Sequence, residues 1–240
     1  MKTPIFLAIV LVSGFSAGIV HGLVNLPLVE PYLDRAISIE NQNRIASGEI
    51  NDTSAYWQEF SKYRIWQKEG SIISGGILGL ATGSLFGVIF AYSRKGLPGK
   101  HNITKSLILG GLMWLTIFFI PFLKFPANPP TVGDPHTIVF RSIMYVLFVG
   151  LSGFGALAFA KLYAKMPRKK KFFAPLGYVV FVSVAFLVVP QNPDKILAPM
   201  DLVNGFRMAS LITMTIYWIV NAIILGLLWQ KFQPDAIENI

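Results

Sequence analysis

Six long stretches of apolar residues constrain this chain more than any other feature of its sequence. They cover approximately residues 4–26, 71–92, 106–123, 139–160, 172–190 and 208–229. A helix of about 20 apolar residues crosses the hydrocarbon core of a bilayer. Because lipid offers no hydrogen bonds to the backbone, each stretch is expected to be helical. The sequence therefore predicts an all-α, polytopic membrane protein in which residues 1–240 form a single membrane domain.

The composition agrees with this class, but the number of spans has two readings. Charged residues make up 14% of the chain, whereas soluble domains contain about 25%. Two stretches are short and another contains Arg141 near its start, so we predict about six spans, with five as the main alternative. The first stretch follows Lys2 as a signal peptide would. However, it stays apolar to Leu28, which favours a retained helix over a cleaved leader.

Two connecting loops contain basic residues and no acidic ones. Such loops remain in the cytoplasm, which places the more mixed loops outside. Lys2 and Lys231 flank the first and last stretches and predict that both termini are cytoplasmic. The net charge of +9 is thus mainly a topology signal, and no nucleic-acid partner is expected. The basic residues are Arg94, Lys95, Lys100 and Lys105 in one loop and Lys161, Lys165, Arg168, Lys169, Lys170 and Lys171 in the other.

The six stretches divide into three hairpins, each with an outer turn that contains proline and asparagine. The turns are Asn25 to Pro27, Asn128 to Pro130 and Gln191 to Pro193. The second and fourth stretches are rich in glycine, which lets helix backbones approach closely in lipid. The outer segment 27–70 is too long for a turn and alternates apolar with charged residues, so we predict an extracytoplasmic amphipathic loop or cap.

Several classes of chemistry are absent from the sequence. The chain contains no cysteine, which excludes disulfides, thiolate metal sites and cysteine nucleophiles. It also contains no phosphate-binding loop, dinucleotide fingerprint or metalloprotease motif. We therefore expect neither an enzyme nor a tightly bound cofactor.

A few polar residues are candidate metal ligands. His21 lies within the first stretch, and ionisable residues inside a membrane often mark an ion path. The alternative is a buried histidine bonded to a neighbouring carbonyl group. In the outer loops the candidates are Glu30, Asp134, His136 and Asp201, although acids beside Pro and Gly are also ordinary turn residues that arginines neutralise. Asn221, inside the last stretch, favours an interhelical hydrogen bond over a ligand.

Three phrases of the sequence suggest a family. They are Gly18-Ile-Val-His-Gly22, Lys124-Phe-Pro-Ala-Asn-Pro-Pro-Thr-Val-Gly-Asp134-Pro-His-Thr137, and Ala198-Pro-Met-Asp-Leu202 leading to Phe206-Arg207. With these, most of the chain resembles a family of predicted cobalt transporter subunits that are membrane proteins. The resemblance implies uptake of cobalt for corrinoid synthesis, and it implies partnership with a small histidine-bearing membrane subunit. The family is usually described with five spans.

These observations lead to one functional expectation and one alternative. We expect a membrane permease-like subunit for a divalent transition metal, most favourably cobalt, with His21, His136, Asp134, Glu30 and Asp201 as metal ligands. Imidazole is needed for this preference because carboxylates alone favour magnesium or calcium. The alternative is a non-transporting subunit that scaffolds a larger membrane complex.

Overall fold

The computed structural model describes residues 2–130, 132–196 and 198–235. Six helical segments in these residues are long and apolar enough to cross a membrane. The result confirms the predicted all-α class and agrees with six spans rather than five. The segments are α1 (Thr3–Leu28), α3 (Ser54–Ser93), α4 to α5 (Asn102–Lys124), η2 to α6 (Pro135–Lys165), η3 to α7 (Arg168–Val188) and α8 (Met200–Phe232).

The chain divides into two compact units. Unit 1 contains α1, α2 (Glu30–Ala46), α3, most of α4 (Asn102–Met113) and α8. Unit 2 contains the π-helix η1 (Trp114–Phe119), α5 (Ile120–Lys124), η2 (Pro135–Thr137), α6 (Ile138–Lys165), η3 (Arg168–Lys170) and α7 (Phe173–Val188). The third span therefore begins in one unit and ends in the other. A single membrane domain remains a prediction.

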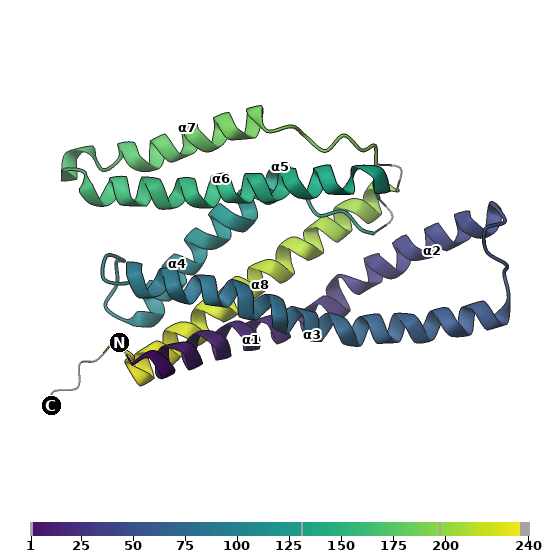
Figure 1. Ribbon diagram of the computed structural model, residues 1–240, viewed down its shortest axis with the longest axis horizontal. Coiled ribbons are helices and arrows are strands. Elements are labelled where there is room, and N and C mark those ends of the chain that lie inside the picture. Colours follow the sequence, from purple (N-terminus) through teal and green to yellow (C-terminus); the bar gives the residue numbers. More distant parts are fainter. Residues whose placement is uncertain (1, 131, 197, 236–240) are drawn as a thin grey trace. The chain divides into compact units, whose positions relative to one another are not determined.

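In unit 1, α1 packs against both α3 and α8, and the three helices lie side by side (Figure 1). Glycines of α1 face glycines of α3 along a seam, which we call the glycine seam: Gly14, Gly18 and Gly22 against Gly75, Gly79 and Gly83. A methyl group added at Gly75 would lie 2.7 Å from the carbonyl oxygen of Gly18. The glycine-rich texture of the second span thus forms a packing seam, as the sequence predicts.

Residues 27–70 of unit 1 form a helical hairpin that continues the first two spans. Only Val29 separates α1 from α2, and α3 contains 40 residues. Such a helix is about 60 Å long, twice the thickness of a hydrocarbon core. A single span therefore needs only about half of α3. Figure 1 shows α2 and the first part of α3 diverging toward the loop that joins them, and Arg64 of α3 contacts Glu30 and Asp34 of α2 where the two are closer.

In unit 2, α6 packs against α7, which follows it through the basic loop (Figure 1). The buried Ser152 hydroxyl donates to the carbonyl oxygen of Thr116 in η1 and lies 2.9 Å from the Tyr178 hydroxyl. Lys124 at the end of α5 is also buried. Its Nζ donates to the carbonyl oxygen of Phe186, 2.6 Å away in the last turn of α7. A cation at this position is stabilised by the negative end of the helix dipole.

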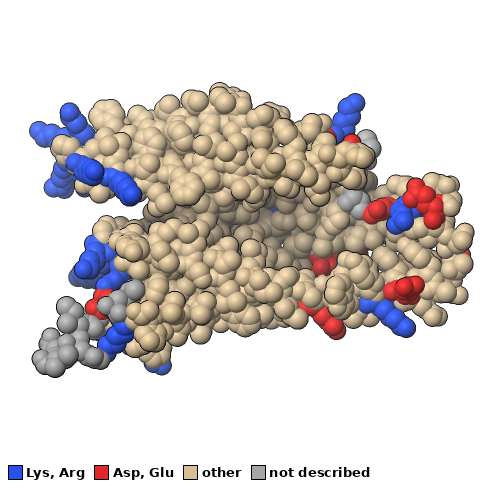
Figure 2. Space-filling model, in the orientation of Figure 1, with Lys and Arg blue, Asp and Glu red and all other residues tan. Residues whose placement is uncertain are grey.

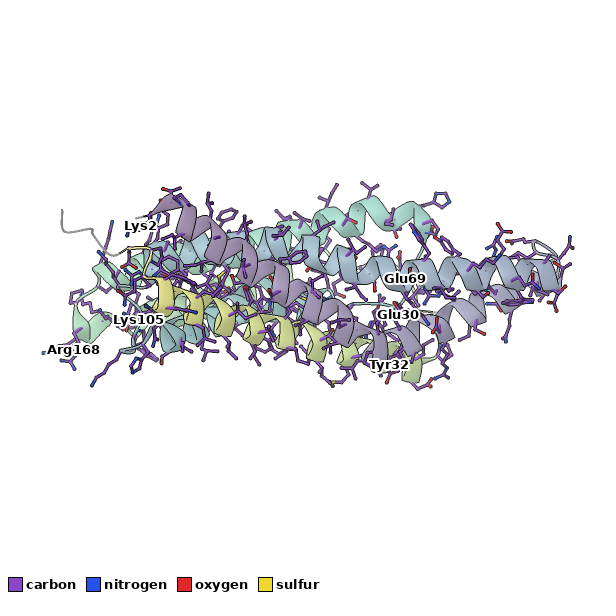
Figure 3. The ribbon with its side chains drawn as sticks, turned by 90° about the horizontal axis from the view of Figure 1, so that it is seen from below. Lys2, Glu30, Tyr32, Glu69, Lys105 and Arg168 are labelled. Atoms are coloured by element: carbon purple, nitrogen blue, oxygen red, sulfur yellow. The ribbon has the colours of Figure 1, made fainter. Side chains whose placement is uncertain are left out.

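Within unit 1, charge is distributed unevenly between the two ends of the helices. Lys2 and Lys105 lie at one end, and Glu30, Tyr32 and Glu69 lie away from it (Figure 3). Figure 2 shows basic side chains gathered at one end of each unit, whereas acidic and basic side chains are mixed at the other end of unit 1. We refer to the end of unit 1 near Glu30 as its outer end.

Candidate functional site

His21 lies on α1 in the outer part of the span and is half-buried. Its Nδ1 is 3.4 Å from Nδ2 of Asn25, one turn further along the helix. With this orientation of the amide, Nδ2 of Asn25 donates to Nδ1 when the neutral ring carries its proton on Nε2. The partner is a side-chain amide and not the backbone carbonyl that the sequence suggested as the alternative to a ligand.

The ring of His21 packs against the ring of Tyr217 from α8, with a T-shaped geometry and 6.0 Å between ring centroids. Tyr217 is buried, and its hydroxyl forms a hydrogen bond with the Thr82 hydroxyl from α3. Thr82 also donates to the carbonyl oxygen of Leu78 on its own helix. Three helices therefore contribute polar groups to one region of the membrane-spanning core.

Asn221 lies one helical turn beyond Tyr217 and is fully buried. The sequence analysis favoured an interhelical hydrogen bond for this residue. The structure differs, because neither Nδ2 nor Oδ1 of Asn221 has a partner among the described residues. The same holds for Nε1 of Trp218, which is also buried. The glycine seam explains part of this result, because Gly83 lies next to the Asn221 amide and has no side chain that could bond to it.

Glu30 is buried at the outer end of unit 1 and forms an ion pair with Arg64 of α3. The Nη2 atom of Arg64 lies 2.6 Å from Oε2 of Glu30 and 2.7 Å from Oδ1 of Asp34. Lys68 donates to the other oxygen of Asp34 at 2.7 Å. We call these four residues the outer ion cluster. Arg64 therefore competes with any metal ion for Glu30.

The outer ion cluster also changes the acidity of Asp34, which lies outside the spans. Partial burial alone would raise the pKa of Asp34. The hydrogen bonds from Lys68 and Arg64, together with their positive charges, outweigh that effect and hold the pKa below its ordinary value. Asp34 is therefore ionised over the whole physiological range and keeps both basic partners.

Asp201, at the start of α8, is exposed and pairs with Arg35 of α2 at 2.8 Å. Exposed pairs of this kind contribute little to stability. Asp201 and Glu30 both belong to unit 1, and each contacts a different arginine.

Asp134 and His136 lie between α5 and α6 in unit 2. Oδ1 of Asp134 accepts a hydrogen bond from the backbone N–H of His136 at 2.8 Å, which makes Asp134 the N-cap of η2. The His136 side chain is exposed. Asp194 lies in the loop between α7 and α8 and bonds to this segment. Its carboxylate accepts a hydrogen bond from the Thr137 hydroxyl and lies 3.0 Å from Nε of Arg141. Arg141 thus neutralises an acid, as the sequence allowed.

The described residues contain no group of three or more histidine and acidic side chains placed to hold a metal ion. The assignment of His21, His136, Asp134, Glu30 and Asp201 as metal ligands remains a prediction. Sequence reasoning missed Tyr217 and Thr82. It also missed Arg64, although the spacing of Glu30 and Asp34 on one helix signals a shared basic partner.

Comparison with known proteins identifies the family of the chain. A family model described as a probable cobalt transporter subunit (CbtA) matches residues 4–230. No curated protein and no solved structure matches the chain. The family match includes all six membrane-spanning segments almost completely. The chain therefore belongs to the probable cobalt transporter subunit (CbtA) family.

Proposed function

We propose that this protein is the permease-like subunit of a system for uptake of divalent transition metals, with cobalt for corrinoid synthesis as its cargo. Both termini lie in the cytoplasm, and the outer ion cluster faces outward. The protein has no catalytic activity of its own and works with a small histidine-bearing membrane subunit. The family match is the observation that supports cobalt most directly.

His21 is the residue best placed to contact the ion within a span. Its imidazole can ligate cobalt when neutral, and it lies in a region where α1, α3 and α8 all contribute polar groups. The outer carboxylates have a smaller role, because Glu30 and Asp201 each pair with an arginine. His136 is exposed and is free to meet the hydrated ion in the outer loop.

The alternative function is that of a scaffold protein that carries no ion itself. The lipid-facing parts of α6 and α7 support it, because few of their side chains are buried within the chain. Such surfaces contact either lipid or the helices of another membrane protein. Transport measurements separate the two functions.

The test is metal uptake by proteoliposomes that contain the purified protein, with and without the small partner protein. We expect cobalt to enter faster than nickel, zinc or magnesium. The variant His21→Gln keeps a polar side chain beside Asn25 but removes the imidazole, and it should slow cobalt entry by about 10-fold or more. His101→Gln, in a basic loop at the other end of unit 1, is the matched control and should transport normally. Equal uptake by both variants would exclude His21 as a ligand, and no uptake by any preparation would favour the scaffold.

A further inference from the structure

Several buried polar atoms in the core of unit 1 have no hydrogen-bond partner among the described residues. They are both amide atoms of Asn221, Nε1 of Trp218 and Oδ1 of Asn25. Burial of an unpaired polar group costs about 1–3 kcal/mol, so native proteins rarely leave several in one region. A bound water molecule is the usual partner where protein atoms are lacking.

The unpaired atoms belong to a longer series of polar side chains. Asn25 contacts His21, and the ring of His21 packs on Tyr217. The hydroxyl of Tyr217 meets that of Thr82, and Asn221 follows Tyr217 by one turn of α8. Asn25 lies close to the outer end of α1, four residues after His21 and five before Glu30. The series thus runs from the outer end of unit 1 to the middle of its spans.

Apolar side chains close the core on the other side of Asn221. Phe86, Phe90, Leu225 and Trp229 are fully buried. The rings of Phe90 and Trp229 pack with centroids 5.0 Å apart, and Phe86 packs on Trp218 at 6.1 Å. These side chains form an apolar plug between Asn221 and the basic end of unit 1.

We propose that water fills a narrow half-channel in unit 1 that opens at the outer end, is bounded by Asn25, His21, Tyr217, Thr82 and Asn221, and ends at the apolar plug. The amide of Asn221 both donates to and accepts from this water, and the indole N–H of Trp218 donates to it. Water at this depth satisfies every unpaired atom named above.

The half-channel gives a route by which a hydrated ion reaches His21 without crossing lipid. That role rests on the proposed function. The presence of water does not rest on it, because the unpaired atoms require partners whether or not the protein transports metal. The half-channel is also one-sided, since the apolar plug lies beyond Asn221.

The absence of cysteine from the chain gives a direct test. A single cysteine introduced at Thr82 or Asn221 is the only thiol of the protein. Thiols react as thiolates, which form in water and hardly at all in a dry apolar core. Right-side-out membrane vesicles are exposed to silver ions for a set time and then denatured. A fluorescent maleimide then labels the thiols that silver has not blocked. No cobalt is present.

Two buried serines give matched controls. Ser106 is fully buried and donates to the carbonyl oxygen of Ala222, so it is close to Asn221 in depth but has its own protein partner. Ser152 in unit 2 is likewise buried and bonded. Replacement of serine or threonine by cysteine changes little in size, so folding should survive in Thr82→Cys, Ser106→Cys and Ser152→Cys.

We expect silver to block Thr82→Cys and Asn221→Cys at least about tenfold faster than the two controls. If Asn221→Cys does not fold, the comparison of Thr82→Cys with the two controls is sufficient for the test. Equal and slow reaction of all these variants would overturn the half-channel, since the core would then be dry. Rapid reaction of Ser106→Cys would also overturn it, because water would then reach buried sites outside the polar series that bounds the half-channel. A normal labelling pattern together with absent cobalt uptake would reject only the proposed function.

Discussion

At the scale of single residues, the ion pair of Glu30 and Arg64 is the feature most sensitive to substitution. Side-chain exposure is 8% for Glu30 and 11% for Arg64, so neither charge is well hydrated. The attraction within such a pair only repays the cost of removing both charges from water. Loss of one partner leaves the other buried and uncompensated, which is far more costly than loss of both.

We therefore predict that Arg64→Met destabilises the protein by about 3–5 kcal/mol. The double variant Glu30→Gln with Arg64→Met should recover most of that loss. Thermal unfolding in detergent, followed by circular dichroism, measures both. If the double variant is as unstable as the single one, the pair contributes through packing and not through charge.

Asp34 gives a prediction about pH. Its pKa is lower in the folded protein than its ordinary value. A lowered pKa means that the stabilisation is complete above the ordinary pKa, near 3.9, and is lost as the pH falls through the folded value. Because the side chain is 45% exposed, we expect the stabilisation to be below about 1 kcal/mol.

The measurement compares unfolding of the native protein with that of Asp34→Asn between pH 6 and pH 3, a range that spans the ordinary carboxyl pKa of about 3.9. The native protein should be the more stable one at pH 6, and the difference should shrink below pH 4. Asp52→Asn, on the same outer hairpin, is a control for a general effect of acid. A difference that grows on acidification would contradict the assigned direction.

At the scale of elements, the glycine seam joins α1 to α3. In lipid, apolar side chains gain little by leaving one apolar medium for another, so close backbone contact has to hold the helices together. At Gly75 an added methyl group meets the carbonyl oxygen of Gly18 at 2.7 Å and the Cα atom of Gly22 at 3.4 Å. These are backbone atoms, which cannot rotate away as the end of a side chain can.

We expect Gly75→Ala to destabilise unit 1 by about 1–3 kcal/mol. Gly111 in α4 is the matched control, because nothing lies within 4 Å of the position that its methyl group would occupy. Gly111→Ala should be neutral or stabilising by about 0.5–1 kcal/mol, since alanine favours the helix. Unfolding of the two variants in the same detergent makes the comparison. Equal stabilities would mean that α1 and α3 separate easily.

At the scale of the whole molecule, the spans were predictable and their partners were not. Apolar length marks the segments that can cross a membrane, and six helices confirm that prediction, whereas the sidedness indicated by the basic residues stays a prediction. The sequence divides the spans into consecutive hairpins. The first pair, α1 and α3, packs together, and the second pair does so through contacts of η1 and α5 with α6, but α7 also packs on α6 and α8 packs on α1. Helix pairing in lipid depends on shape, which hydropathy does not record.

The candidate site was partly predictable for a related reason. His21 and Asn221 stand out because they are polar residues within apolar stretches. Tyr217 and Thr82 do not stand out, since tyrosine is largely apolar and the threonine hydroxyl can bond to its own helix, as it does to Leu78. Their contact with each other joins residues 135 positions apart in the chain. Only the packing of both α3 and α8 against α1 brings them together.

The orientation of the whole chain gives the last prediction. The segment 161–171 holds six basic residues and no acid, and the other basic loop lies two spans before it. Each Lys or Arg next to the anionic inner leaflet contributes about 1 kcal/mol, so an inverted chain would lose several such contributions together.

We therefore expect a cysteine at Glu59, on the exposed outer hairpin, to react with an impermeant maleimide in intact cells. A cysteine at Lys169 should react only after the cells are permeabilised. The native chain has no thiol and gives the blank. The opposite pattern would invert the chain and place the proposed half-channel on the cytoplasmic side, where it would serve release instead of entry.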